Sequence, residues 1–164
     1  MQIDDASADD LPAILAITNA VIADTFAIWR DTPTTIEERT SWWRARLDAG
    51  FPVLVARQPG VLGFASYGPF RTGDGYRYTV EHSVHVAAAA RGAGAGGALL
   101  AALIERARAQ RLHMMVAGVD AGAEASLRLH RRFGFIEAGR LAEIGHKGDG
   151  WRDLIFLQKR LGDG

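Results

Sequence analysis

Hydrophobic and polar side chains alternate through residues 78–86, near the middle of the chain. One face of this segment carries Tyr78, Val80, His82, Val84 and Val86, and the other carries Thr79, Glu81, Ser83 and His85. Strict alternation predicts a strand with one buried face. The other face is rich in polar groups, so this strand is the first candidate for a functional site.

A glycine-rich run follows the strand and leads into a helix. The run reads Arg91-Gly92-Ala93-Gly94-Ala95-Gly96-Gly97, and Leu99, Leu100, Leu103 and Ile104 follow at helical spacing. Small residues permit left-handed turns and let the main chain approach a ligand closely. A helix that begins among them presents unpaired N–H groups and the positive end of its dipole, a combination that binds phosphate. The pattern therefore predicts a phosphorylated cofactor.

The remaining hydrophobic pattern predicts a mixture of strands and helices. Strands are expected at residues 2–4, 53–57, 61–67, 113–119, 135–143 and 151–159. Helices are expected at residues 11–22, 35–50 and 124–133, the first two preceded by capping pairs, Ser7 with Asp10 and Thr35 with Glu38. Residues 58–60 are typical of a hairpin turn, and residues 145–150 are expected to form a loop.

Length and charge limit the class of protein. The 164 residues suit one domain, residues 1–164. With 19 basic and 19 acidic residues, the balanced charge favours neither nucleic acid nor a membrane surface as partner and leaves a small molecule. Because the chain has no cysteine, a thiol nucleophile is excluded. The acidic amino terminus lacks the features of a signal peptide, so a cytoplasmic location is expected.

Two motifs resemble the GNAT acetyltransferases. Arg91, Gly94 and Gly96 match the pyrophosphate loop of that superfamily, and residues 79–86 resemble the strand of its phosphinothricin and methionine sulfoximine acetyltransferase branch. Shorter matches to that branch are Thr25-Phe26-Ala27-Ile28-Trp29, Thr32-Pro33, Leu129-His130 and Gly134-Phe135. The resemblance implies an α/β (α+β) GNAT fold, with a central mixed, mostly antiparallel sheet flanked by helices. It also implies a homodimer.

The resemblance implies an acetyl-CoA-dependent N-acetyltransferase that acts on the amino group of a small amino-acid-like compound. It assigns the binding of acetyl-CoA to the main chain before the loop, to the loop itself and to one helical histidine. These residues are Val84, His85, Val86, Arg91, Gly92, Ala93, Gly94, Ala95, Gly96, Gly97 and His130. No metal is expected, because His82, His113 and His146 lack partners at ligand spacing.

Glu81 and His130 are the predicted catalytic residues. Acetyl transfer to an ammonium group gains from a base that removes its proton, and Glu81 lies on the polar face of the central strand. The alternative for Glu81 is a structural carboxylate bonded to a turn. His130 occupies the position where the related enzymes protonate the departing thiolate. It is expected either to do so or only to contact the cofactor, and a packing role remains open.

The acceptor site is predicted from an apolar loop at residues 24–33 and from the turn before the central strand. Its expected residues are Phe26, Trp29, Arg71, Thr72, Gly73, Tyr76, Arg77 and Glu81. Arg71 is expected to hold an anion. The Lys-x-Arg pair of phosphinothricin acetyltransferases is absent, so methionine sulfoximine and methionine sulfone are the expected acceptors. A cofactor-binding asparagine of the family is replaced by Ala123.

Three alternatives remain open at this stage. The acceptor could be a polyamine, an aminoglycoside or a peptide amino terminus. The chain could also be a non-catalytic sensor of acyl-CoA or nucleotide. Finally, Gly92, Gly94 and Gly97 fit a dinucleotide-binding fingerprint with Asp120 as its ribose-binding acid. The five residues that separate strand and fingerprint, 87–91, argue against that last alternative.

Overall fold

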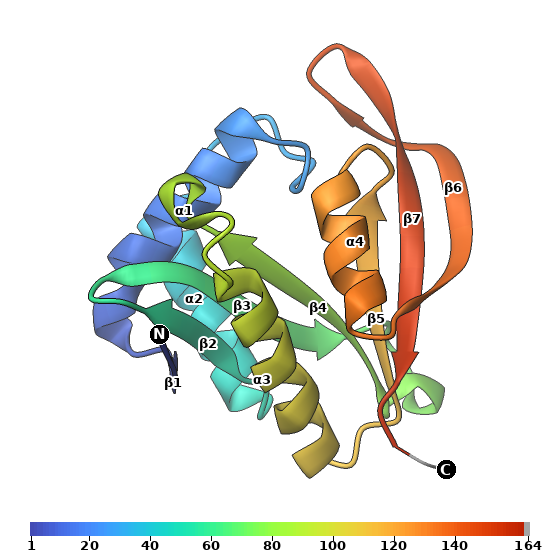
Figure 1. Cartoon of the computed structure of the whole chain (residues 1–164), viewed down its shortest axis with the longest axis horizontal. Coiled ribbons are helices and arrows are strands. Elements are labelled where there is room, and N and C mark those ends of the chain that lie inside the picture. Colours follow the sequence, from blue (N-terminus) through green and yellow to red (C-terminus); the bar gives the residue numbers. More distant parts are fainter. Residues whose placement is uncertain (163–164) are drawn as a thin grey trace.

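The computed structural model describes residues 1–162 and places every strand in one seven-stranded sheet of order β1-β2-β3-β4-β5-β7-β6 (Figure 1). The strands are β1 (Gln2–Asp5), β2 (Val53–Arg57), β3 (Val61–Pro69), β4 (Thr79–Val86), β5 (Met114–Asp120), β6 (Ile136–Lys147) and β7 (Gly150–Arg160). The helices are α1 (Leu11–Asp24), α2 (Ile36–Asp48), α3 (Ala95–Ala109) and α4 (Glu124–Arg132). This confirms the predicted α/β class and the order of elements.

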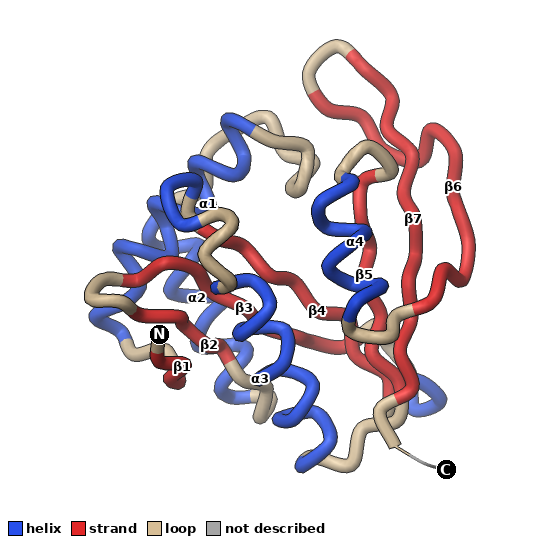
Figure 2. The backbone as a smooth tube through the Cα atoms, viewed as in Figure 1, coloured by secondary structure: helices blue, strands red, loops and turns tan. Residues whose placement is uncertain are grey.

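The junction between β4 and β5 organises the sheet. These two strands form its parallel pair, and the other neighbouring strands run antiparallel. Pairing of β4 with β5 covers only the register Thr79 with Met114 to Glu81 with Val116. Beyond Glu81 the strands diverge, and the tube in Figure 2 shows β4 and β5 running apart. The second half of β4 therefore has no strand partner on the side that faces β5, and we call this side its free edge.

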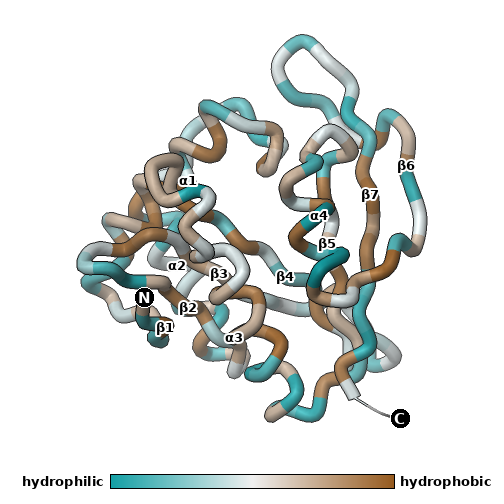
Figure 3. The backbone as a smooth tube through the Cα atoms, viewed as in Figure 1, coloured by the Kyte–Doolittle hydropathy of each residue, from teal (hydrophilic) through white to brown (hydrophobic). Residues whose placement is uncertain are grey.

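Helices cover the sheet on both faces. On one face α3 and α4 pack over a core that includes Tyr67, Val80 and Leu157. On the other face α1 packs over Val55 and Phe64, with Trp42 of α2 against the same core. The hydropathy colours of Figure 3 show hydrophobic stretches through the strands and a hydrophilic tip on the β6–β7 hairpin. The two helical layers thus cover the polar and the apolar face of β4 separately.

Two sequence predictions need correction. Strand β6 continues to Lys147 and β7 begins at Gly150, so the predicted loop at residues 145–150 shrinks to a tight turn. The register shifts between Leu141 and Gly145, and this bulge lets glycine-rich sequence stay in the ladder. Tyr78 was expected on the buried face, but it precedes β4, is 53% exposed and lies under the guanidinium of Arg77.

The dinucleotide-binding alternative is wrong. A Rossmann unit needs consecutive parallel strands joined by crossover helices, whereas β2, β3 and β4 form an antiparallel meander. Asp120 is buried and already bonded to Arg152, Trp29 and the N–H of Gly122, so it offers no free carboxylate to a ribose. Within residues 1–162 no helix combines the length and the apolar character needed to span a membrane.

Candidate active site

The glycine-rich loop has the backbone that the sequence predicts for anion binding. Gly92 and Gly94 adopt φ of 81° and 87°, in the left-handed region that favours glycine. A methyl group added to either residue would meet nothing within 4 Å, so the loop is open to a ligand. Helix α3 begins at Ala95, directly after Gly94. Residues 91–94 are exposed, and the first N–H groups of α3 have no acceptor within the helix, so a pyrophosphate can bind there.

Packing behind the loop fixes its position. Gly96 faces Val86 and Leu129, which lie 3.6 Å and 3.5 Å from where a methyl group would stand, and Gly97 faces the ring of Phe133. The loop is thus held between the end of β4 and helix α4. These contacts, the open glycines and the helix start fit the phosphates and the pantetheine arm of a coenzyme A thioester.

His130 lies in a buried pair with His82, which the sequence did not predict. Their Nε2 atoms are 3.2 Å apart, and both residues are under 10% exposed, at 5% and 7%. His130 donates its Nδ1–H to the carbonyl of Ser126 at 2.7 Å, so its Nε2 accepts a hydrogen bond from His82. Burial lowers the pKa of His82 to about 3 and also lowers the pKa of His130, against the effect of the Ser126 carbonyl. Both imidazoles are therefore neutral at pH 7.

Glu81 lies on the opposite face of β4 from this pair, at the point where β4 and β5 part. Its Oε1 is 3.1 Å from the position that a methyl group on Gly118 would take, with Leu154 and Phe156 beside it. Gly118 therefore leaves the room that the carboxylate occupies. Burial raises the pKa of Glu81 above its usual 4.5, and the positive charge of Arg71 opposes that shift. A half-buried carboxylate with a raised pKa is suited to accept a proton near neutral pH.

The predicted acceptor turn is exposed and lies near Glu81. Arg71, Thr72, Gly73, Tyr76 and Arg77 are all exposed. The Arg71 guanidinium stacks 5.3 Å from the ring of Phe70, whereas Arg77 donates to the carbonyl of Asp74 and stacks on Tyr78. Arg71 follows Gly68, the register partner of Glu81, by three residues, and its charge acts to lower the pKa of Glu81 against the larger effect of burial. The Arg77 side chain is directed toward its own turn.

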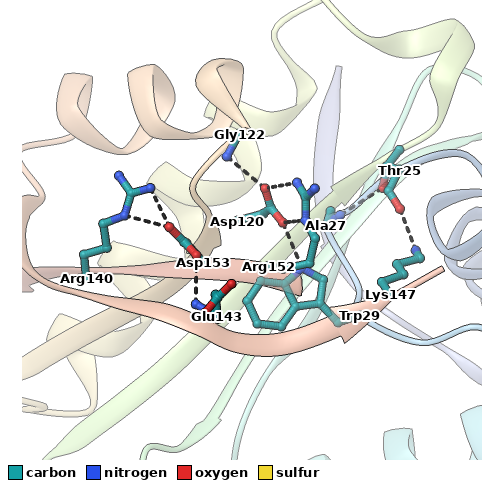
Figure 4. A network of polar contacts seen from close by, with 10 residues as sticks. All are labelled: Thr25, Ala27, Trp29, Asp120, Gly122, Arg140, Glu143, Lys147, Arg152 and Asp153. Atoms are coloured by element: carbon teal, nitrogen blue, oxygen red, sulfur yellow. Dashed lines mark hydrogen bonds and ion pairs between the residues drawn. The ribbon is translucent and has the colours of Figure 1, made fainter. Parts of the chain in front are cut away.

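The apolar loop after α1 is tied to the end of β5 and to β7 by a polar network (Figure 4). Trp29 donates its indole N–H to Asp120 at 3.0 Å, and Arg152 makes forked bonds to the same carboxylate at 2.7 and 2.8 Å. The Arg152 guanidinium also stacks 3.9 Å from the ring of Phe26. Burial alone would raise the pKa of Asp120, but Arg152, Gly122 and Trp29 hold it below its usual value. The two predicted wall residues thus converge on one ion pair.

A second anchor for this loop comes from Lys147 at the end of β6. Its buried ammonium donates to three carbonyl groups, those of Ile22, Thr25 and Ile28, at 2.6, 2.5 and 2.7 Å. Two of these carbonyls belong to the end of α1 and the residue after it, where helical carbonyls lack partners. The third belongs to the loop itself. Lys147 therefore fixes the direction in which the loop leaves the helix.

A cavity of about 440 Å³ opens on the same face of the sheet as Glu81, displaced toward β6 and β7. It is mostly apolar and is lined by Phe70, Tyr76, Thr79, His113, Met114, Val116, Ala138, Gly139, Arg140, Leu141, Phe156, Leu157 and Gln158. Glu81 is not among the lining residues. The cavity adjoins the predicted acceptor turn through Phe70 and Tyr76 but does not reach the predicted base.

Sequence reasoning predicted the left-handed glycine turn and the helix start after it, and it missed several side-chain partners. His82 was assigned to the apolar face of the strand without a role, although a histidine on such a face needs a buried partner. Lys147 and Arg152 were read as loop and strand residues, because nothing local links them to residues 25–29. Among residues 1–162, no cluster of His, Asp and Glu that could hold a metal is present.

Comparison with known proteins gives one family. The sequence profile of the Acetyltransferase (GNAT) family matches residues 14–135. An L-methionine sulfoximine/L-methionine sulfone acetyltransferase of Pseudomonas paraeruginosa is 50% identical over 159 residues, which cover 96% of this chain and 92% of that protein. Further similar proteins are named phosphinothricin N-acetyltransferase.

Solved structures agree on the fold. A ribosomal-protein-alanine N-acetyltransferase from Brucella melitensis superposes with a TM-score of 0.97 at 49% identity, covering 98% of this chain and all (100%) of that chain. An acetyltransferase from Salmonella typhimurium, determined with its cofactor acetyl-CoA, gives a TM-score of 0.97 at 42% identity and covers 100% of this chain and 95% of that one.

Proposed function

This chain belongs to the GNAT acetyltransferase family, and from that premise we propose that it moves the acetyl group of acetyl-CoA to the amine of a free amino acid such as methionine sulfoximine or methionine sulfone. The observation that carries the proposal is the position of Glu81. This half-buried carboxylate stands where β4 parts from β5, on the face of the sheet opposite His130 and close to the charge of Arg71.

Glu81 serves as the general base. Ammonium groups of free amino acids are mostly protonated at neutral pH, and only the neutral amine attacks a thioester. Glu81 takes one proton from the ammonium group, directly or through a water molecule, and the neutral amine then attacks the thioester carbon. As the C–N bond forms, the C–S bond breaks and its electron pair leaves on sulfur as the thiolate, which the second proton released by the nitrogen neutralises. Its raised pKa makes it a stronger proton acceptor than an exposed glutamate, and the positive charge of Arg71 opposes that rise.

Acetyl-CoA supplies the activated acetyl group, and the site proposed for it consists mainly of main-chain groups. The N–H groups of residues 92–97 hold the pyrophosphate, and the free edge of Val84, His85 and Val86 bonds the pantetheine arm and the thioester oxygen. For His130 the geometry supports the cofactor contact over the acid. Its one N–H is already donated to Ser126, so no proton faces a departing thiolate in this arrangement.

The acceptor class rests on the side chains near Glu81 and on the relatives. Arg71 offers a forked cation to an oxygen-bearing group, and Phe26 with Trp29 forms the apolar wall. The relative from Pseudomonas is named for methionine sulfoximine and sulfone, which have an amine, a carboxylate and a tetrahedral polar head. The structural neighbour named for ribosomal-protein alanine keeps a peptide amino terminus as the second candidate.

A competition assay tests this proposal. The purified protein, acetyl-CoA and equal concentrations of L-methionine sulfone, L-methionine sulfoximine, phosphinothricin, spermidine, an aminoglycoside and a peptide with amino-terminal alanine are mixed, and each product is quantified by mass. The sulfone and sulfoximine should dominate, with phosphinothricin poorer because the Lys-x-Arg pair is absent. A clear excess of acetylated peptide or polyamine would overturn the acceptor class and leave the family unchanged.

The proposal also covers domain organisation, assembly and location. We propose that the chain acts as one domain, since all its described strands share one sheet. We also propose that it works as a homodimer in the cytoplasm. The exposed apolar residues Leu141 and Ile144 on β6 and Trp151 on β7 support a subunit contact. Sedimentation at micromolar concentration checks the assembly.

A further inference from the structure

Two arginines of helix α2 have no anionic partner although they are half-buried. The other half-buried arginines, Arg30, Arg57, Arg106 and Arg152, each pair with a carboxylate. Arg39 and Arg46 pair with no carboxylate of residues 1–162, and the Nε atom of each is buried without a hydrogen-bond partner. A desolvated guanidinium without a counter-charge is unfavourable, so these two arginines are candidates for binding an anionic ligand.

Arg39 and Arg46 lie on one face of α2, with Trp42 between them. Residues spaced i, i+3 and i+7 share a helix face. The guanidinium of Arg39 stacks 4.7 Å from the Trp42 ring centroid and that of Arg46 lies 6.0 Å from it, while the Trp42 ring packs edge-on against Phe64 of β3. The face therefore looks onto the sheet. Burial lowers the pKa of both groups.

The sheet surface under this face is the Glu81 side of β4. A methyl group on Gly68 would stand 2.5 Å from Cζ of Arg46, so the missing side chain of Gly68 makes the seat for that guanidinium. Gly68 is the register partner of Glu81. Because Cβ positions of paired residues are about 4.5–5.5 Å apart, Cζ of Arg46 lies within about 8 Å of Cβ of Glu81.

Arg39 stands at the other end of the same stretch of β4. Its guanidinium stacks on Trp42, Trp42 packs edge-on against Phe64, and the Phe64 ring centroid lies 5.3 Å from that of His85. Burial first, and the charge of Arg39 second, lower the pKa of His85 to about 4. Together Arg39 and Arg46 flank β4 from Glu81 to His85. This is the stretch along which, under the proposed function, the acceptor amine meets the thioester.

We propose that Arg39 and Arg46 form, across Trp42, a carboxylate-binding site that holds the α-carboxylate of the acceptor while its amine lies at Glu81. The inference rests on the proposed function. Because the sulfone head is neutral, the carboxylate is the only full negative charge of methionine sulfone. The two unpaired guanidinium groups of Arg39 and Arg46 are the best match for that charge. Arg71, which is exposed and single, is left for the polar head.

The test compares two acceptors that differ by the carboxylate. L-methionine sulfone and 3-(methylsulfonyl)propan-1-amine share the amine and the sulfone. Arg39→Gln and Arg46→Gln should each lower kcat/KM for L-methionine sulfone about 10- to 100-fold, mainly through KM, and leave the already low value for the propylamine within about twofold. Arg44→Gln, which changes an exposed arginine of the same helix, is the matched control and should change neither value.

Equal losses on both acceptors would mean that the arginines only support the fold, and unchanged values would mean that they do not touch the acceptor. Either result overturns the site. L-norleucine, which has the carboxylate but no sulfone, adds a third arm. If its turnover is insensitive to Arg46→Gln while that of the propylamine falls, the arginines bind the polar head and the carboxylate assignment is wrong.

A binding readout separates this inference from the proposed function. Sodium sulfate should raise the Tm of the wild type and of Arg44→Gln more than that of Arg39→Gln or Arg46→Gln at equal ionic strength. If no free amino acid is acetylated but the sulfate difference persists, the proposed function fails and the anion site stands. If the sulfate difference is absent, or if Arg46→Gln instead dissociates a dimer, the ligand site is refuted.

Discussion

The two sides of the candidate active site are built by different means. On the proposed cofactor side the binding groups would be main-chain N–H groups, and their positions follow from two left-handed glycines and a helix start within four residues of sequence. On the proposed acceptor side the groups are side chains of α2, β4, β5, β6, β7 and the connecting loops, and the contacts that hold them span up to 125 residues. One side is local in sequence and the other is not.

This difference explains how a binding site can be both shared and specialised. A main-chain cradle tolerates many sequences, provided that glycine remains where φ is positive. Residues on the proposed acceptor side can change one at a time without disturbing the glycine loop at residues 91–97. The reason is that Lys147, Asp120 and Arg152 hold the apolar loop at residues 24–33 independently of it. Substitutions should therefore separate the kinetics of the two substrates.

The largest effect is expected for Glu81→Gln, which keeps the shape and removes the base. General-base catalysis contributes about a hundredfold to ten-thousandfold in rate, so kcat should fall by that range while the KM for acetyl-CoA is little changed. The acid limb of the wild-type kcat profile should lie above pH 4.5, because burial raises the pKa of Glu81. Wild-type turnover by Glu81→Gln at every pH would refute the assignment.

The same substitution should stabilise the fold. A carboxyl group whose pKa is higher in the folded than in the unfolded chain favours folding below the unfolded pKa, and that stability is lost as the pH rises through the folded pKa. Above the folded pKa the ionised Glu81 therefore opposes folding. Glu81→Gln should raise the Tm at pH 7 and not at pH 4, which calorimetry at the two values measures.

Lys147→Met should give the next largest effect, on stability and on the acceptor side only. Methionine retains an unbranched apolar stem but leaves three carbonyls without their donor, so the free energy of unfolding should fall by about 2–4 kcal/mol. The KM for the acceptor should rise and that for acetyl-CoA should not. Lys159→Met changes the only other lysine, which donates to no residue within 1–162, and serves as the control.

Gly94→Glu tests the cofactor side. It forces a side chain into φ of 87° and brings a like charge to the phosphate site, so the KM for acetyl-CoA should rise roughly 10- to 100-fold with the acceptor KM unchanged. Gly94→Asn is the matched control, because asparagine tolerates this backbone and adds no charge. A normal KM for acetyl-CoA in Gly94→Glu, with the fold intact by circular dichroism, would refute the pyrophosphate assignment.

Periodicity in the sequence was enough for nearly every helix and strand, because each hydrophobic pattern is local. It also located Glu81 and the glycine loop. It could not reveal that the guanidinium of Arg46 occupies the space that Gly68 leaves free, or that His82 meets His130 from 48 residues away, since such pairs depend on tertiary contacts between elements. Strand β6 was cut short for the same reason: its last residues are held in the ladder by their partners in β7, not by their own propensity.

The smallest effect is expected for Ala123→Asn, which restores the asparagine of the resembling family at the start of α4. Ala123 occupies the N-cap of this helix, and no side chain there bonds the first N–H groups. Asparagine at an N-cap stabilises a helix by about 0.5–2 kcal/mol relative to alanine, so the Tm should rise by a few degrees.

If the residue also bonds the pantetheine arm, Ala123→Asn should bind acetyl-CoA more tightly. Isothermal titration of this variant and of Ala123→Ser measures the difference. Serine caps the helix equally well but is shorter. A matching gain in Tm for both variants, with tighter binding for asparagine alone, would separate the cap from the cofactor contact. Unaltered acetyl-CoA affinity in Ala123→Asn would show that the cofactor side lost nothing when alanine took this position.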